Sequence, residues 1–205
     1  MTEAALKHLR SSDKVMGRLI RKVGPCALRP QRRRNPYESL VRSVVYQQLN
    51  GIAAATIFGR VKALFPGSRF PTPNDLLETP DERLRGAGLS RAKTAAMKDI
   101  AAKTLAGVVP SSREIASMGE PAIIERLTTI RGVGPWTVEM LLIFTLGRED
   151  VLPVTDYGVR KGFALAYGWK ELPTPKELLE YGERWRPHRT TAAWYCWRAL
   201  DLPKG

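Results

Sequence analysis

The stretch RGVGPWT, residues 131–137, joins two segments with helical patterning. PAIIERLTTI before it predicts an amphipathic helix, and VEMLLIFTL after it predicts a second helix that is almost wholly apolar. Pro121 and Pro135 both suit the first turn of a helix, where a missing N–H group is tolerated. The stretch therefore predicts two helices joined by a short, glycine-dependent turn.

This turn has the features of an anion site. Gly132 and Gly134 permit backbone angles closed to other residues and leave no side chain in the way. The N–H groups of the turn, that of Val133 included, can approach an anion together with the positive end of the second helix, and Arg131 adds charge. The turn suits one phosphate of a nucleic-acid backbone, bound without reading its sequence. On the glycines alone, a turn used only for packing is the alternative.

The charge balance favours a polyanionic partner. The 205 residues include 33 Lys and Arg against 20 Asp and Glu, a net charge of +13, which is typical of proteins that bind nucleic acid or an anionic membrane surface. No apolar run approaches the roughly 18 residues of a membrane span, and the N-terminus lacks the apolar core of a signal peptide. We expect a cytoplasmic protein that binds nucleic acid and not a membrane.

The sequence gives little support for a metal site or for nucleophilic catalysis by Ser or Cys. The two cysteines, Cys26 and Cys196, have no metal-ligand spacing, and their number excludes a Cys₄ zinc site or an iron–sulfur cluster. The two histidines, His8 and His188, are isolated in the sequence and are expected at the surface. No Ser or Cys lies in an elbow-type motif.

Nearly every periodic segment is helical. SLVRSVVYQQL places Leu40, Val44, Val45 and Leu49 on one stripe, and AAATIFGRVKALF, RAKTAAMKDIAAKTLA and KELLEYGERW behave similarly. Turn signals in FPGSRFPTPND, RGAGLS and WKELPTPKE separate these segments. No stretch shows strand alternation flanked by hairpin turns. The sequence predicts an all-α fold over residues 1–205.

Four segments follow one another along the chain between about residues 36 and 198: NPYESLVRSVVYQQLNGIAAATIFGR, GLSRAKTAAMKDIA, LTTIRGVGPWTVEMLLIFTLGREDVLPVTDYGVRKGF and GERWRPHRTTAAWYCWR. Together they resemble the helix-hairpin-helix, Gly/Pro-rich loop and Asp signature (HhH-GPD) of the base-excision DNA glycosylase superfamily. They are most similar to its alkylation-repair branch, the 3-methyladenine DNA glycosylase II type. The resemblance implies a monomer of two interleaved helical lobes with a DNA-binding cleft. It places the hairpin over about residues 121–146 and an Asp loop over about residues 147–160.

The resemblance assigns the catalytic role to Asp156. A single carboxylate beside the sugar can stabilise an oxocarbenium-like state and orient a water molecule. Asp156 also suits the N-cap of a helix over YGVRKGFAL. The two roles are compatible, because a helix N-terminus favours negative charge.

Two departures from other members of the family limit which reaction the resemblance implies. Members that cleave the strand carry a lysine directly before the Thr of the second hairpin helix, where this chain has Trp136. Members with an iron–sulfur cluster carry four cysteines after the hairpin, where this chain has only Cys196. The resemblance therefore implies hydrolysis without lyase activity. The substrate would be alkylated purines, whose positive charge already makes them good leaving groups.

A cationic base can be selected by stacking on aromatic faces. The resemblance places Trp136 and Trp197 in the base pocket, with Tyr46 and Tyr157 as further candidates. Core packing is the alternative for each. Met140 stands where the best-known type of the branch has a pocket tyrosine, which leaves the lesion range open.

A flipped base leaves a hole in the duplex. The resemblance makes Gln48 and Leu49 candidates to fill it, with Asn50 facing the minor groove, whereas Leu49 could instead complete the core stripe. The segment RPQRRR predicts a solvated basic face with sequence-independent phosphate contacts. Arg160, just after Asp156, could add to the positive electrostatic field that attracts the DNA phosphates.

The hairpin of this family often holds a monovalent cation through main-chain carbonyls. By position these belong to Thr128, Ile130 and Val133, so Na⁺ or K⁺ is a possible ligand, and no other cofactor is expected. Two other functions remain open. A non-catalytic damage-recognition module would not need Asp156, and a bifunctional oxidised-base enzyme would need a lysine in place of Trp136.

Overall fold

The computed structural model describes residues 2–31 and 34–203, and this part of the chain is helical and contains no strand. The chain forms two compact units. The central unit is Gln31–Leu141, and the terminal unit combines Met1–Pro30 with Leu142–Gly205. The all-α prediction is confirmed.

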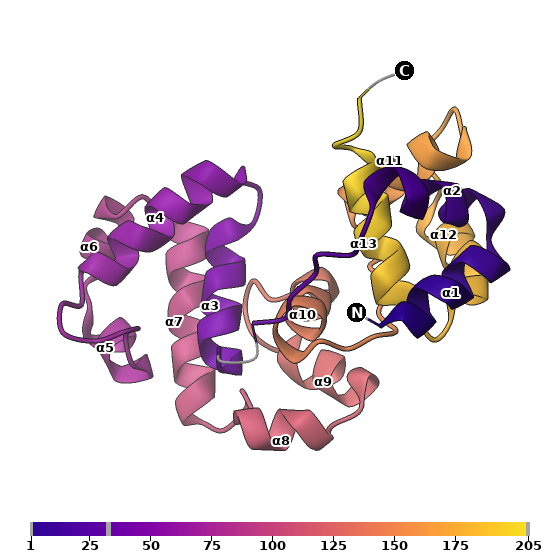
Figure 1. Ribbon diagram of the computed structural model, residues 1–205. Helices are drawn as coiled ribbons and strands as arrows, with labels where there is room; N and C mark the ends of the chain where they lie inside the picture. Colours follow the sequence, from indigo (N-terminus) through magenta and orange to yellow (C-terminus); the bar gives the residue numbers. More distant parts are fainter. Residues whose placement is uncertain (1, 32–33, 204–205) are drawn as a thin grey trace. The chain divides into compact units, whose positions relative to one another are not determined.

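The central unit is built around one long helix, α7. Its helices are, in chain order, α3 (Pro36–Tyr46), α4 (Gly51–Ala63), α5 (Pro73–Glu78), α6 (Asp81–Gly86), α7 (Arg91–Leu105), α8 (Ser112–Ser117), α9 (Glu120–Leu127) and α10 (Pro135–Leu141) (Figure 1). Helix α7 packs against α3, α5 and α6. It buries Met97 and Ile100 completely, as α3 buries Leu40 and Val44.

Side-chain caps determine where several of these helices begin. The side chains of Asn35, Asn50 and Ser90 each accept a hydrogen bond from the N–H group three residues on, and so begin α3, α4 and α7. Thr72 and Ser111 form reciprocal capping boxes at α5 and α8. These starts are local, because cap and partner lie within one helical turn.

The terminal unit joins the two ends of the chain. Its helices are α1 (Glu3–Ser12), α2 (Lys14–Val23), the π-helical segment η1 (Leu142–Leu146), α11 (Tyr157–Tyr167), α12 (Pro175–Gly182), the 3₁₀ turn η2 (Glu183–Trp185) and α13 (Arg189–Ala199). Helix α13 packs against both α11 and α2. The contact with α11 requires Gly162, because a Cβ there would lie 1.8 Å from the carbonyl oxygen of Cys196.

Asp13, which is 4% exposed, organises the core of this unit. One carboxylate oxygen accepts the N–H groups of Val15 and Met16, at 2.9 and 3.0 Å, and so caps α2. The other accepts the Tyr167 hydroxyl at 2.7 Å and the Trp185 indole N–H at 2.9 Å. Burial alone would raise the pKa of Asp13, but the hydrogen bonds outweigh it, and the net pKa is lowered.

Three sequence predictions need correction. Helix α3 ends at Tyr46 instead of continuing through Leu49, and Leu49 is 38% exposed, so it does not complete the core stripe. The segment FPGSRFPTPND is not wholly a turn, because α5 begins within it. His8 and His188, expected at the surface, are both partly buried, and their rings meet edge to face with centroids 5.5 Å apart. Within the described residues, no helix is long and apolar enough to cross a membrane.

Candidate active site

Asp156 is held in one orientation at the start of α11. One of its oxygens, Oδ1, accepts the Val159 N–H at 2.8 Å, which confirms the predicted N-cap. The same oxygen accepts the indole N–H of Trp197, also at 2.8 Å. The residue is only partly buried. A carboxylate fixed from two sides is therefore presented at an accessible position.

Gly158 makes room for this arrangement. A Cβ at Gly158 would lie 2.9 Å from Cδ1 of Trp197 and 3.1 Å from Oδ1 of Asp156, both closer than real Cβ contacts permit without movement. The absence of a side chain in the first turn of α11 thus lets the indole reach the carboxylate.

Phe144 extends the aromatic surface next to Asp156. Its ring stacks on that of Trp197, with centroids 5.6 Å apart and planes inclined by 28°, and it is 38% exposed. Phe144 lies in η1, and π-helical turns are frequent at functional sites. We did not predict this residue, because nothing in the apolar run VEMLLIFTL indicates which member faces outward.

Helix α13 also anchors the start of the Asp loop. The Thr190 hydroxyl accepts the Val151 N–H at 2.9 Å, and the nearly buried Arg189 donates from Nε to Asp150 at 2.8 Å. Because Trp197 is on the same helix, α13 holds the loop at both ends. The segment RTTAAWYCWR therefore has a positioning role in addition to its predicted pocket tryptophan.

Tyr157 and Arg160 complete the predicted residues of α11. Tyr157 is 62% exposed, with Nζ of Lys161 5.6 Å from the ring centre. The alternative that this tyrosine packs in the core is therefore wrong. Nε of Arg160 donates to the carbonyl of Pro173 at 2.7 Å, a structural contact that we did not predict. A DNA contact by Arg160 stays a prediction.

The two glycines of the hairpin differ in the central unit. Gly132 has a left-handed φ of +74°, and a Cβ there would lie 2.7 Å from Cβ of Ala96, so both conformation and packing require glycine. Gly134 is not in the left-handed region, and no atom lies within 4 Å of an added Cβ. The prediction that Gly134 needs an unusual backbone angle is wrong, and only its open surroundings fit the approach of an external group.

Two N–H groups of the turn are already used inside the protein. The Arg131 N–H donates to Asp99 at 2.7 Å, and the Val133 N–H donates to the Ile130 carbonyl at 3.1 Å. The Val133 side chain is buried, whereas that of Arg131 is exposed. An anion at this turn would therefore meet the guanidinium of Arg131 and the glycine N–H groups, but not the N–H of Val133.

The turn between α3 and α4 is strained and exposed. Gln48 has a φ of +56°, in the left-handed region that residues other than glycine rarely adopt. Asn50 is occupied in capping α4 through the Ala53 N–H at 2.9 Å. Ile52, in the first turn of α4, is 83% exposed, a surface apolar residue that we did not predict.

The other predicted pocket residues have mixed surroundings. The Arg42 guanidinium lies 3.7 Å from the ring centre of Tyr46, and Phe58 meets the same ring edge to face, so much of the Tyr46 ring is already packed. Trp136 is partly buried and Met140 is buried, one turn apart on α10. These three residues belong to the central unit, whereas Asp156, Tyr157 and Trp197 belong to the terminal unit.

The basic segment RPQRRR is only partly solvated. Arg29 donates to the carbonyls of Cys26 and Leu28, and Arg34 pairs with Glu38 at 3.5 Å. Arg32 and Arg33 lie outside the described residues.

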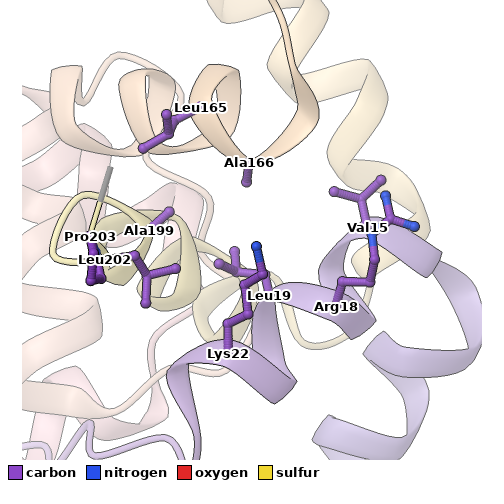
Figure 2. A pocket seen from close by; sticks show the side chains of 9 residues that line it. All are labelled: Val15, Arg18, Leu19, Lys22, Leu165, Ala166, Ala199, Leu202 and Pro203. Carbon is purple, nitrogen blue, oxygen red and sulfur yellow. The ribbon is translucent and has the colours of Figure 1, made fainter. Parts of the chain in front are cut away.

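A cavity of about 600 Å³ in the terminal unit is separate from these residues (Figure 2). It lies among α2, α11 and the C-terminal end of α13, with Leu19 and Leu165 as apolar walls and Arg18 and Lys22 as charged ones. Its lining includes none of the predicted site residues, so the cavity takes no part in the site described above.

Comparison with known proteins agrees with this geometry. The model of the HhH-GPD superfamily base excision DNA repair protein family matches residues 41–187. DNA-3-methyladenine glycosylase 1 of Schizosaccharomyces pombe is 40% identical, over 98% of this chain and 89% of the relative.

Solved structures show the same fold. The S. pombe 3-methyladenine DNA glycosylase (Mag1) in complex with abasic DNA superposes with a TM-score of 0.91 at 40% identity, covering 97% of each chain. A DNA-3-methyladenine glycosidase from Bacillus halodurans gives a TM-score of 0.82 at 36% identity, covering 95% of this chain and 88% of the other. The chain therefore belongs to the HhH-GPD superfamily of base excision DNA repair proteins.

Proposed function

We propose that this protein is a monofunctional DNA glycosylase that hydrolytically excises alkylated purines, of the 3-methyladenine and 7-methylguanine type, from duplex DNA. The observation that carries the proposal is the carboxylate of Asp156, a partly buried residue, held by the N-terminus of α11 and by Trp197. The name of the S. pombe relative, DNA-3-methyladenine glycosylase 1, supports the substrate class.

Asp156 supplies the electrostatic part of the reaction. Excision breaks the bond between deoxyribose and a purine nitrogen, and positive charge builds on the sugar in the transition state. A carboxylate beside the sugar stabilises that charge and orients the attacking water. Because Val159 and Trp197 already hold Asp156, little reorganisation is needed when the charge develops.

Trp136 supports simple hydrolysis. Strand cleavage by a lyase requires an amine that attacks the sugar and forms a Schiff base, and an indole cannot do this. A cationic alkylpurine leaves readily, so a general acid is not needed. Trp197, stacked on Phe144, and the exposed Tyr157 offer aromatic faces for the cationic ring.

The central unit supplies the grip on DNA. Arg131 and the N–H groups of Gly132 and Gly134 would hold one phosphate, in a contact independent of base sequence. Gln48 and Leu49, on the exposed turn after α3, would fill the position that the flipped base leaves.

A monovalent cation would fit the hairpin carbonyls. Thr128 directly follows the last residue of α9, where carbonyls lack partners within the helix. With Ile130 and Val133 it offers neutral oxygen ligands, and bound Na⁺ or K⁺ would add positive charge near the phosphate. We expect no other cofactor and a cytoplasmic location. We also expect a monomer, because each step uses one chain and its DNA.

The test is to incubate purified protein with methylated duplex DNA and to identify the released bases by chromatography. We expect 3-methyladenine and 7-methylguanine from the wild type. Asp156→Asn should lose at least about 10²-fold of the excision rate, as for removal of one electrostatic stabiliser, and should bind lesion DNA within about tenfold.

Three results would contradict this proposal. Unchanged base release by Asp156→Asn would remove the carboxylate from the mechanism. Tight lesion binding without release by the wild type would favour a non-catalytic recognition module. Covalent trapping by borohydride would indicate a bifunctional enzyme.

A further inference from the structure

Helix α7, formed by the segment GLSRAKTAAMKDIA, has no role in the reaction proposed above, yet it contacts both DNA-binding elements of the central unit. Nζ of Lys93 donates to a carbonyl of the turn after α3, at 2.7 Å. Ala96, one turn on, packs under Gly132, and Asp99, a further turn on, accepts the Arg131 N–H at 2.7 Å. The turn after α3 and the hairpin therefore rest on one helix.

Gln47 joins the two elements directly. Its side-chain Nε2 donates to the Gly132 carbonyl at 3.0 Å and to the Thr137 hydroxyl at 2.9 Å. Its main-chain N–H donates to the Ser43 carbonyl at 3.1 Å, and its own carbonyl accepts Nζ of Lys93. Four hydrogen bonds hold this residue, so its position follows that of the hairpin and of α7.

The next residue shows the consequence. Gln48 is the one non-glycine residue with positive φ among the residues the structure describes. This conformation is unfavourable for an L-residue and persists only when the surroundings impose it. Directly before Gln48, Gln47 is held by its four hydrogen bonds, and Lys93 adds a bond to the Val45 carbonyl at 2.8 Å.

We propose that Gln47, clamped by Lys93, is a positioning residue that locks the turn that fills the duplex to the loop that grips the phosphate. The two elements then act on DNA as one rigid piece. Extruding a base requires free energy for unstacking and unpairing. A rigid connection inserts the turn while the backbone is held, which favours the extruded state. This role rests on the function proposed above.

Three substitutions separate this role from support of the fold. Gln47→Glu keeps the size of the side chain but removes the donors to Gly132 and Thr137. Lys93→Met removes the ammonium group but keeps most of the aliphatic stem. Lys98→Met is the matched control on the same helix, because Lys98 pairs with the exposed Asp81 at 2.6 Å.

Each variant is tested on 7-methylguanine placed opposite cytosine or opposite an abasic-site analogue. Single-turnover excision from the paired substrate should fall about tenfold in Gln47→Glu and about threefold in Lys93→Met, as expected for lost hydrogen bonds. Both deficits should shrink at least about threefold on the unpaired substrate, because less free energy is needed for extrusion. Lys98→Met should match the wild type on both substrates.

Extrusion is also measured without chemistry, by the fluorescence of 2-aminopurine beside the lesion on binding. Gln47→Glu should lower the fluorescence rise while its affinity for DNA stays within about threefold of the wild type, because the phosphate contacts remain. The double variant Gln47→Glu/Lys93→Met should be little worse than Gln47→Glu alone, because both act on one contact set.

Equal deficits on paired and unpaired substrates, or no deficit in either variant, would overturn the positioning role. If Gln47→Glu does not fold, Lys93→Met decides the matter, because it leaves the Gln47 side chain in place. A wild type that releases no base, but whose fluorescence rise is lowered by Gln47→Glu, would refute the proposed function and still support the positioning role.

Discussion

Asp13 and Asp156 each cap the N-terminus of a helix, and each accepts a hydrogen bond from a tryptophan indole. They differ in their surroundings. Asp13 is 4% exposed and also accepts the Tyr167 hydroxyl, whereas Asp156 is only partly buried beside exposed Tyr157. The same local chemistry thus gives a structural carboxylate in the core and a candidate catalytic carboxylate at the surface. Burial distinguishes the two roles.

Replacing each carboxylate by its amide should give the largest and most opposite effects. Asp156→Asn should slow excision by at least about 10²-fold but change the free energy of unfolding by less than about 0.5 kcal/mol, because asparagine also caps helices. Asp13→Asn should destabilise the protein by about 2–4 kcal/mol, because buried donors lose their charged acceptor. Single-turnover rates of folded protein and urea unfolding check this pair. Loss of activity in folded Asp13→Asn would break the distinction.

The two tryptophans should repeat the contrast on a smaller scale. Trp197→Phe removes the hydrogen bond to Asp156 and should slow excision about 10-fold to 100-fold, the range for a bond to a charged acceptor. Trp185→Phe should leave the rate of folded protein unchanged and lower the free energy of unfolding by about 1–3 kcal/mol. An equal loss of stability in both variants would mean that Trp197 serves mainly the core.

Gly158→Ala tests whether the indole must lie against the carboxylate. The added methyl would push Trp197 away, so we expect excision to slow about fivefold to tenfold, as for one weakened hydrogen bond. Gly59→Ala, in α4, is the control, because an added Cβ there would have no atom within 4 Å. This substitution should stabilise the helix by about 0.5–1 kcal/mol. Wild-type activity in Gly158→Ala would show that the hydrogen bond is dispensable.

Acid should expose the smallest difference. The pKa of Asp13 is lowered in the folded state, so its stabilising contribution is present above the unfolded value near 3.8 and is lost as the pH falls through the lower folded value. The stability difference between wild type and Asp13→Asn should therefore be constant at pH 5–7 and shrink below about pH 4. Urea unfolding at each pH measures this. A difference that grows in acid would contradict the lowered pKa.

Local interactions explain why parts of the site were predictable. The N-cap at Asp156 and the prolines at the starts of α9 and α10 depend on neighbours within one turn. The left-handed Gly132 likewise follows from the tight turn that contains it. The same reasoning failed for Gly134, which is not in the left-handed region, and for Leu49, because the apolar spacing does not show that α3 ends at Tyr46.

The sequence by itself determined the helices, the hairpin and a carboxylate at a helix start, because caps, turns and apolar periods act over a few residues. Tertiary structure alone decided which aspartate is buried, that Trp197 reaches Asp156, that Phe144 stacks outside the core and that Gln47 meets Gly132. These contacts join residues 41 and 85 positions apart at Asp156 and Gln47, and 172 apart at Asp13 and Trp185. No local pattern encodes such pairs, because they form only when whole helices pack together.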